Sequence, residues 1–454
     1  MGISIKWDIT YRCNLFCTHC IKGDQLSNTA KEPSLEEVKQ IIDNLSEKKI
    51  DYIHLLGGEP TVRDDFIEIL NYFDEKGIPF GLNTNGLLMG TDRMLNAVTS
   101  PKNFKNIIFS IEAPIAEVND EMRGKAVFDK TISNLKKLIA YKKEKNYDHF
   151  YVTINTVISK TNMDYILPMI NYCVELGVDE LVLLQLIPEG NALDANITLS
   201  FDDELHLVNE IASVYSTVKD KLRIIPRFVR PLAVDYANEV LEQDFPDIEH
   251  GCNAGTEFAC ITNLGELYSC DRYMEATLKK NTPQDLSLIH KTFDEIWRKN
   301  EFTDIFSAIN QESFYQNTDP CNSCKHLKVS CWPCPVELMN NIDDVYMMKS
   351  CIQYNKIIQE HHLKNDCEII VTDKIIREVA SDEEDYILFN TETFETISLN
   401  QEAYLIWNEL RLMEQIQYNK AISSISDKYS FAFSYVKETI DSLINLNYLR
   451  EKAT

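Results

Sequence analysis

The first 190 residues alternate between short apolar runs and longer amphipathic stretches. Six apolar or β-branched runs predict strands: ISIKWDI, YIHLLGG, PFGLNTNG, NIIFSIE, FYVTINTVI and ELVLLQLI. The stretches between them have helical spacing, and one opens with Ser34 three residues before Glu37, the sequence signature of a capping box. Six strand–helix units in series predict an α/β fold whose parallel sheet closes, or nearly closes, into a partial barrel. We expect the functional site in the loops that follow the strands.

The last ninety residues have a different pattern. KIIREVA, DYILFN and TISLN predict three short strands, whereas QEAYLIWNELRLM, NKAISSISDKY and SYVKETIDSLINLNYL predict helices from the spacing of their apolar residues. Three strands and three helices of this size predict a small winged-helix domain. The acidic run from Ser381 to Asp385 disfavours nucleic-acid binding by this domain.

Composition and charge exclude several classes of protein. The chain has 454 residues, of which 44% are hydrophobic, so it is long enough for two or three globular domains. A formal net charge of −26 without a basic stripe disfavours nucleic acid as a partner. No apolar run approaches about 18 residues and no signal peptide is visible, so we expect a cytoplasmic protein without a membrane segment. Thirteen cysteines in that compartment stay reduced, and their clustering favours metal binding over disulfides.

Cys13, Cys17 and Cys20 lie close together in the loop predicted after the first strand. A structural zinc site uses four ligands in tetrahedral geometry, and the only additional donor nearby is His19, between two of the thiols. Three thiolates would leave one iron of a four-iron cluster without a protein ligand, free to chelate a substrate. Zinc, or cysteines that bind no metal, is the alternative interpretation of these three residues alone.

The cysteine triplet, followed by Gly57-Gly58-Glu59-Pro60 after the second strand, resembles the radical S-adenosylmethionine (SAM) superfamily. That resemblance implies a partial (β/α)6 barrel whose N-terminal [4Fe-4S] cluster is held by Cys13, Cys17 and Cys20. It also implies that a 5′-deoxyadenosyl radical made from SAM abstracts hydrogen from the substrate. The residues that it assigns to SAM are Gly57, Gly58, Glu59, Pro60, Asn83, Ser110, Arg123, Gln185 and Leu186.

Two points qualify the assignment of SAM contacts. Each polar residue in this set could by itself cap a loop, and it is their order at successive strand ends that favours the cofactor. Many relatives carry Asp-Gly after the fourth strand, where this chain has Glu112-Ala113. The departure concerns the turn that follows this strand.

A second group of cysteines extends from residue 252 to residue 351. Two CxxC pairs are typical of a zinc ribbon, although eight thiols also suffice for two fully ligated four-iron clusters. The run, with Gly265 five residues before Cys270, resembles the SPASM extension of radical SAM peptide-modifying enzymes. That resemblance implies two auxiliary clusters, the first held by Cys252, Cys260, Cys270 and Cys334 and the second by Cys321, Cys324, Cys331 and Cys351. It also matches Asp271 to the proposed base of sulfatase-maturing enzymes, with a local cap as the alternative role.

The C-terminal domain has a resemblance of its own. The segment Thr396–Asn400, running into Ala403–Trp407 and with Leu443–Leu446 further on, resembles the peptide chaperone of pyrroloquinoline quinone biosynthesis. It is also similar to the recognition elements of ribosomally made, modified peptides. The resemblance implies that a leader peptide adds as a strand beside the third strand, with the third helix as the other wall of the groove. It places Ile397, Leu399 and Tyr435 at this site, whereas a purely structural winged helix is the alternative.

These resemblances predict four regions: a radical SAM partial barrel at 1–200, a bridging region at 201–250, a SPASM domain at 251–360 and a winged-helix peptide-recognition domain at 366–454. The predicted activity is maturation of a ribosomally synthesised precursor peptide, with thioether cross-links of the sactipeptide or ranthipeptide type as the first choice. Carbon–carbon or carbon–oxygen cross-linking, formylglycine formation, and a non-catalytic iron–sulfur or zinc peptide escort are the alternatives. Three [4Fe-4S] clusters, SAM and a low-potential electron donor such as ferredoxin or flavodoxin are expected. Cys173, in an apolar helical stretch, reads as a core thiol, and Cys367 has no assigned role.

Overall fold

A computed structural model describes most of the chain and divides it into two compact units. The described residues are 2–27, 32–193, 197–245, 253–271, 285–297, 321–327, 329–331, 346–365, 367–371, 376–380, 386–390, 396–413, 415–446 and 448–453. The first unit is Met1–Tyr354 and the second is Asn355–Thr454. Among the described helices, none is long and apolar enough to cross a membrane.

The first unit is built on a nine-stranded sheet with the order β7-β6-β5-β4-β3-β2-β1-β8-β9. Its first six strands along the chain are β1 (Ile3–Thr10), β2 (Ile50–Gly57), β3 (Phe80–Thr84), β4 (Phe104–Ser110), β5 (Tyr151–Ile158) and β6 (Glu180–Gln185). Each of these strands pairs in parallel with the next. The parallel α/β architecture expected from the sequence is therefore confirmed.

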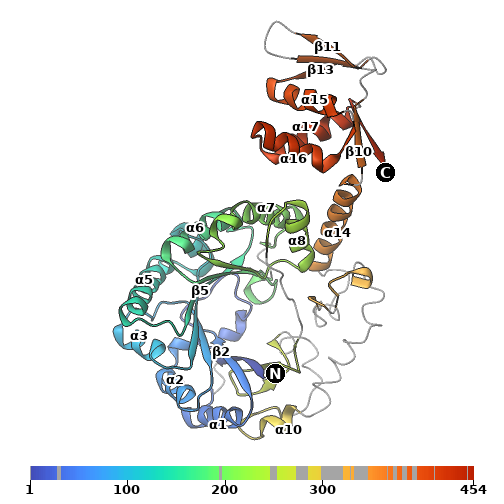
Figure 1. Cartoon of the computed structure of the whole chain (residues 1–454). Helices are drawn as coiled ribbons and strands as arrows, with labels where there is room; N and C mark the ends of the chain where they lie inside the picture. The colour runs from blue at the N-terminus through green and yellow to red at the C-terminus, as the bar shows by residue number, and fades with distance from the viewer. Residues whose placement is uncertain are drawn as a thin grey trace. The chain divides into compact units, whose positions relative to one another are not determined.

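Helices follow the outside of this sheet. The longer ones are α1 (Leu35–Ser46), α2 (Phe66–Glu75), α3 (Asp92–Thr99), α4 (Ala116–Arg123), α5 (Val127–Lys145), α6 (Ile166–Leu176) and α7 (Phe201–Val218). Figure 1 shows most of them in an arc around the curved sheet, from α1 to α7. Single 3-10 turns lie at Gly23–Ser27, Pro60–Val62, Met163–Tyr165, Gly190–Ala192 and Cys321–Ser323.

The alternation along the strands explains this layering. Every second side chain of a strand, such as Leu55 on β2 and Leu82 on β3, is fully buried under the helices. Aromatic rings continue the same layer from Trp7 through Phe73 and Phe80 to Phe104, with successive ring centroids 5.5 to 6.0 Å apart. The predicted capping box at the start of α1 is present, with the Ser34 hydroxyl and Glu37 carboxylate each bound to the other's backbone N–H.

Several elements of the first unit were not predicted. Strand β7 (Arg223–Pro226) extends the sheet beyond β6, so the region expected to bridge two domains contributes α7 and a strand to this sheet. Strand β8 (Phe258–Ile261) pairs in parallel with β1 and antiparallel with β9 (Leu267–Tyr268). These strands have only two to four residues, too few to show a period in the sequence. Further short elements are α8 (Pro231–Asp235), a π-helical turn (Tyr236–Val240) and α10 (Phe293–Trp297), and α14 (Tyr346–Asn365) extends into the second unit.

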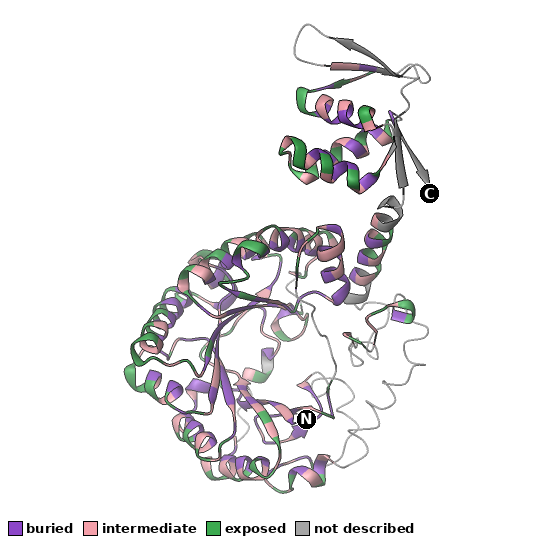
Figure 2. Ribbon diagram, viewed as in Figure 1, coloured by how far each residue is buried: buried purple, intermediate pink, exposed green. Residues whose placement is uncertain are grey.

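The second unit contains the three predicted strands and the three predicted helices. Strands β11 (Ile376–Ala380), β12 (Tyr386–Asn390) and β13 (Thr396–Leu399) form an antiparallel sheet with β13 at one edge. Helices α15 (Gln401–Met413), α16 (Tyr418–Tyr429) and α17 (Phe433–Asn445) pack around Ile406, Trp407 and Ile440. Figure 2 shows their buried residues on the faces that meet one another and their exposed residues outside.

A second antiparallel sheet in this unit was missed. It has the order β14-β10-β15 and consists of β10 (Cys367–Val371), β14 (Gln415–Gln417) and β15 (Leu449–Ala453). The expectation of three strands was therefore wrong in number. The last helix was predicted to run to Leu449, but it ends at Asn445, and Leu449 begins β15.

Candidate active site

The cysteine loop, residues 11–22, follows β1 at the C-terminal edge of the parallel sheet. Its three thiols are half-buried and none forms a disulfide. Burial raises the pKa of the Cys13 thiol to about 11, and negative charge on Cys17 and Cys20 adds to this shift. The three sulfur atoms are therefore close enough to interact electrostatically. A bound metal centre would be held by the thiolate forms and would release their protons.

The glycines after β2 hold the start of this loop. Gly58 donates a hydrogen bond to the Thr10 carbonyl at 2.8 Å, and the Glu59 N–H donates to the Arg12 carbonyl at 2.8 Å. A Cβ atom on Gly58 would lie 2.3 Å from the Arg12 oxygen, and one on Gly57 would lie 2.1 Å from the Thr10 oxygen. Glycine is thus required here because the two loops touch through their backbones.

Glu59 is almost fully buried, and both of its carboxylate oxygens accept hydrogen bonds from protein groups. One oxygen accepts from the hydroxyls of Thr61 and Thr84, and the other from the Asn85 N–H at 2.6 Å. Burial raises the pKa of Glu59 despite these hydrogen bonds. In the structure this side chain joins the loops after β2 and β3, and its contact with the SAM ammonium group stays a prediction.

The loop after β3 also reaches the cysteine loop. The Asn85 side chain donates to the Asn14 side chain at 2.7 Å, in the loop between Cys13 and Cys17. Asn83, assigned to SAM, lies on β3 with its amide oxygen 2.6 Å from the His54 ring on β2. Burial lowers the pKa of His54 to about 4, so a neutral ring orients Asn83. Sequence reasoning missed His54. The residue alternates with the buried Ile53 and Leu55, so it lies on the opposite face of β2 from the helices.

Arg123, at the C-terminal end of α4, binds Glu112 rather than solvent. Its guanidinium donates to the Glu112 carboxylate at 2.7 Å, and its carbonyl lies 3.8 Å from the Cys17 sulfur. The guanidinium Nε is buried and has no hydrogen-bond partner among the described residues. An unpaired buried donor beside the cysteine loop fits an anionic group such as the carboxylate of SAM.

The loop after β6 completes the enclosure of the cysteine loop. The Asn191 side chain donates to the Cys17 carbonyl at 2.9 Å, and its N–H donates to the Cys20 carbonyl at 3.0 Å. Gly190 fits so closely that a Cβ atom there would lie 2.5 Å from the Cys20 oxygen. No motif pointed to Asn191, because its partners are main-chain carbonyls, which any sequence provides.

The remaining predicted SAM contacts lie at the same edge of the sheet. Ser110 is the last residue of β4 and Gln185 the last residue of β6, and both are half-buried. Leu186 follows Gln185 and is buried, as is Pro60 at the start of its 3-10 turn. Their contacts with a cofactor stay predictions.

The four thiols assigned to the second auxiliary cluster lie near one another. Burial raises the pKa of Cys351, and negative charge on Cys331, Cys321 and Cys324 adds to the shift. Arg230, before α8, lies close enough to Cys331 and Cys351 to oppose these shifts. The segment between Cys324 and Cys331 is anchored through His326, whose ring lies 2.6 Å from Asp235 and 2.8 Å from Ser330.

The first auxiliary set is only partly visible. Cys260 on β8 and Cys270 after β9 are buried, whereas Cys252 and Cys334 lie outside the described residues. Asp271 forms an ion pair with Lys6 of β1 at 2.7 Å; burial opposes ionisation, but the lysine lowers the pKa of the carboxyl group. Asp271 is therefore a carboxylate held by a cation, and its role as a base stays a prediction.

The described residues do not show the pattern of a site for a single metal ion. Among them, no three His, Cys, Asp or Glu side chains converge on a site for one metal ion. A four-iron cluster does not need such convergence, because each thiolate binds a different iron. Of the cysteines outside the three sets, Cys173 is fully buried in α6 and Cys367 begins β10.

Comparison with known proteins identifies relatives of this chain. Residues 7–173 match the Radical SAM superfamily. Mycofactocin maturase MftC of Mycolicibacterium smegmatis is 25% identical over 332 residues, which cover 71% of this chain and 76% of that protein. An AdoMet-dependent heme synthase of Methanosarcina barkeri is 27% identical over 339 residues, which cover 72% of this chain and 89% of that protein.

Solved structures show the same fold. SuiB of Streptococcus suis bound to S-adenosylmethionine has a TM-score of 0.60 at 19% identity and covers 75% of each chain. The AdoMet-bound enzyme anSMEcpe, solved with the Cp18Cys peptide, has a TM-score of 0.57 at 18% identity, covering 79% of this chain and 96% of its own. This chain carries a radical SAM domain and is a radical SAM enzyme, for which one [4Fe-4S] cluster and SAM are the implied cofactors.

Proposed function

We propose that this radical SAM enzyme modifies a ribosomally synthesised precursor peptide, whose leader binds to the second unit. The observation that carries the proposal is a groove between β13 and α17. Mycofactocin maturase is one of the relatives by sequence, and the solved structures of SuiB include one bound to a precursor peptide, SuiA. The relatives also include heme synthases, but a peptide groove favours a peptide substrate over a tetrapyrrole.

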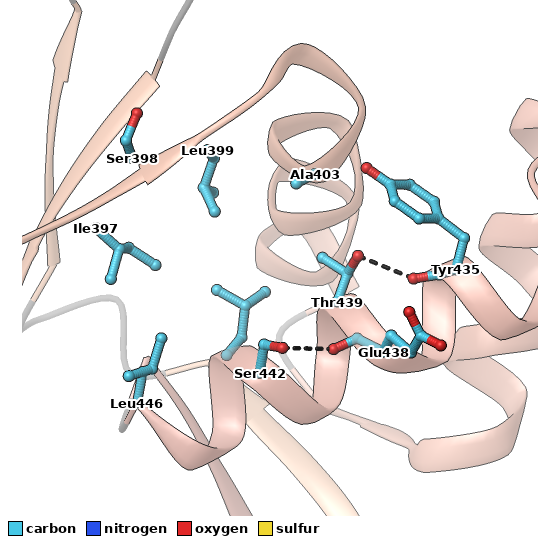
Figure 3. A pocket seen from close by; sticks show the side chains of 10 residues that line it. Ile397, Ser398, Leu399, Ala403, Tyr435, Glu438, Thr439, Ser442 and Leu446 are labelled. Carbon is cyan, nitrogen blue, oxygen red and sulfur yellow. Dashed lines mark hydrogen bonds between the residues drawn. The ribbon is translucent and has the colours of Figure 1, made fainter.

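The groove has the geometry that strand addition needs. Strand β13 is the edge of its sheet, and its outer side pairs with no other strand in the described part of the chain. Figure 3 shows Ile397 and Leu399 pointing into the groove while Ser398 points away from it. The opposite wall is α17, with Tyr435 at one end and Leu446 at the other. An extended peptide could therefore bind the backbone of β13 and place alternate side chains between the two walls.

The volume and chemistry of the groove suit a short apolar segment. Its volume is about 450 Å³. Ala403 and Leu443 are among its apolar lining residues, and the hydroxyl groups of Thr439 and Ser442 donate to backbone carbonyls of α17 rather than into the groove. Glu438 supplies the one carboxylate among the lining residues and favours a basic residue in the leader.

In the first unit, the loops around the cysteine loop bind the cluster and SAM and orient them toward the substrate in this proposal. Cys13, Cys17 and Cys20 would hold the cluster, which when reduced would supply the electron for cleavage of SAM and so the radical that takes a hydrogen atom from the substrate. Arg123 and Asn83 hold the cofactor in this proposal, and Asp271 accepts the proton released from the oxidised peptide. A low-potential donor such as ferredoxin or flavodoxin would supply the electron for SAM cleavage. A thioether cross-link is the proposed product: a C–H and an S–H bond break as the C–S bond forms, and the electron that remains after hydrogen-atom and proton loss would pass to a proposed auxiliary cluster. Carbon–carbon or carbon–oxygen cross-links are the alternative products.

The groove is tested by replacing an apolar residue that lines it. In Leu446→Glu, a carboxylate at the end of the groove would need desolvation when the leader binds, so we expect the Kd for the precursor to rise about tenfold or more. Fluorescence anisotropy with a labelled precursor peptide measures this change. SAM cleavage without peptide should stay at the wild-type rate.

A matched control for this test lies in the same unit. Leu412 is a leucine of α15 that is more exposed than Leu446, at 67% against 45%, and it does not line the groove. Leu412→Glu should leave the Kd unchanged. Equal affinities for the wild type and Leu446→Glu would contradict leader binding at this groove.

Metal analysis tests the proposal of two auxiliary clusters. Anaerobically reconstituted protein should contain about twelve irons per chain if all three clusters form. Cys321→Ala should reduce this number and halt product formation, yet still permit SAM cleavage, because the cysteine loop is untouched. Zinc bound in place of iron at the eight-thiol region would contradict the proposal.

A further inference from the structure

We propose that His19 is a positioning residue for the cysteine loop, held in place by Glu112. The two side chains together form what we call the His19–Glu112 latch. His19 Nε2 lies 3.2 Å from a Glu112 carboxylate oxygen, and the two side chains are only 7% and 1% exposed. Because His19 stands directly between two cysteines, whatever fixes its ring also fixes the direction of the Cys17–Cys20 segment.

Glu112 is itself held rigidly at the end of β4. Its second carboxylate oxygen accepts from the Val157 N–H of β5 at 2.7 Å, and its first also accepts from Arg123. Its backbone N–H and carbonyl bind the side chains of Asn119 and Asn162, at 3.0 and 2.7 Å. The carboxylate is thus fixed relative to the sheet. Its contact with His19 therefore fixes the Cys17–Cys20 segment relative to the sheet as well.

Glutamate at this position explains the departure from the Asp-Gly of many relatives. The carboxylate has to reach from the strand end to a ring in the cysteine loop, to Arg123 and to the backbone of β5. The additional methylene of glutamate supplies that reach. Burial opposes ionisation of Glu112, but the neighbouring His19 and Arg123 lower its pKa to about 2, so the carboxylate is charged in the folded protein.

Other contacts of the Cys17–Cys20 segment are made to α4 and to the loop after β6. The Thr18 N–H and hydroxyl both donate to the Met122 carbonyl, at 2.9 and 3.3 Å, and Asn191 binds two carbonyls of the segment. The Thr18 side chain is thus bound to α4 and not to the sheet. Among the contacts described, the latch is the one that fixes a side chain of this segment to the sheet.

The other ring nitrogen of His19 points to a role beyond packing. Nδ1 is buried and has no hydrogen-bond partner among the residues that the structure describes. A buried polar atom without a partner is costly unless a bound group satisfies it. The latch itself needs only Nε2, which contacts Glu112, so a variant that keeps this contact without Nδ1 should keep the position of the segment.

Two substitutions of similar size separate the two ring nitrogens. In His19→Gln, the amide nitrogen can occupy the place of Nε2 and donate to Glu112, whereas in His19→Asn the shorter side chain reaches only the place of Nδ1. His19→Phe keeps a ring but removes both nitrogens. Glu112 and Arg123 keep each other as partners in all three variants, so the test avoids leaving a buried charge unpaired.

The readout is the N-terminal cluster itself. Electron paramagnetic resonance of the reduced protein, with and without SAM, reports this cluster selectively, because only a cluster with an open iron responds to SAM. We expect His19→Gln to keep at least about 80% of the SAM-induced spectral change, and His19→Asn and His19→Phe to keep less than about half, as expected for losing a group that orients metal ligands. Iron content is measured on the same samples, and no peptide is needed, so the result is independent of the proposed substrate.

Each other outcome contradicts the proposal. A wild-type spectral change in His19→Asn or His19→Phe would show that the latch is dispensable. Equal losses in His19→Gln and His19→Asn would show that the Nε2 contact is not the one that matters. Loss of far-ultraviolet circular dichroism in His19→Asn, with retention in His19→Gln, would make the latch a general fold contact rather than a positioning contact for the cluster.

Discussion

Replacing Cys13, Cys17 and Cys20 together with alanine should abolish the formation of 5′-deoxyadenosine from SAM. It should also remove about four of the irons in the reconstituted protein. The physical reason is that these three thiols would leave one iron open for SAM, whereas each proposed auxiliary set would have a thiolate for every iron. Liquid chromatography of anaerobic reactions containing SAM and dithionite measures the first effect, and iron analysis measures the second.

Cys173→Ala provides the matched control. Cys173 is a fully buried thiol in α6 that belongs to none of the three sets. Its removal leaves a small cavity in the first unit, and we expect the iron content and 5′-deoxyadenosine formation to stay at wild-type levels. Formation of 5′-deoxyadenosine by the triple variant would contradict the assignment of the radical site.

Gly58→Ala should have the second largest effect. The added methyl group would lie 2.3 Å from the Arg12 carbonyl and 2.7 Å from the Tyr11 carbonyl, both backbone atoms at the start of the cysteine loop. The two loops must separate to accept it, which we expect to cost about 2 kcal/mol or more of stability. Because the displaced segment leads directly into Cys13, the iron of the N-terminal cluster should be lost as well. Chemical denaturation and iron analysis measure the two effects.

Gly77→Ala separates steric crowding from backbone strain. Gly77, after α2, has a φ of +67°, and a Cβ atom there would have nothing within 4 Å. Alanine should therefore cost only about 1 kcal/mol, from the left-handed backbone conformation. The iron content should not change. If both alanine variants kept their iron and lost the same stability, the contact between the glycine segment and the cysteine loop would not matter for the site.

The parts of the fold that could be predicted are those with a long and regular pattern. Strands β1 to β6 have five to eight residues, and their helices bury one apolar face, so both periods are visible in the sequence. Strands β7 and β8 have four residues each and are recognisable only from their partners. The second sheet of the second unit was missed because its strands are also recognisable only from their partners. Strand β10 pairs with β14 and β15, which lie far along the chain.

The candidate site divides in the same way. The cysteine triplet and the glycine segment are local patterns, so they could be read directly from the sequence. His54, Asn191 and the partnership of His19 with Glu112 arise from contacts between loops that are distant in sequence. Single residues of common types carry no signal of such contacts. Their identification required the strand order that brings the loops together.

The parallel pairing of β8 with β1 has a consequence for how the chain folds during synthesis. Ser4 pairs with Phe258, so one edge of β1 has no partner until β8 has left the ribosome, more than two hundred residues later. Until then β1, which leads into the cysteine loop, presents an open strand edge on which other nascent chains can pair. Contacts at such long sequence separation also slow folding. Cluster insertion is therefore expected to follow the emergence of β8 rather than the emergence of the cysteine loop itself.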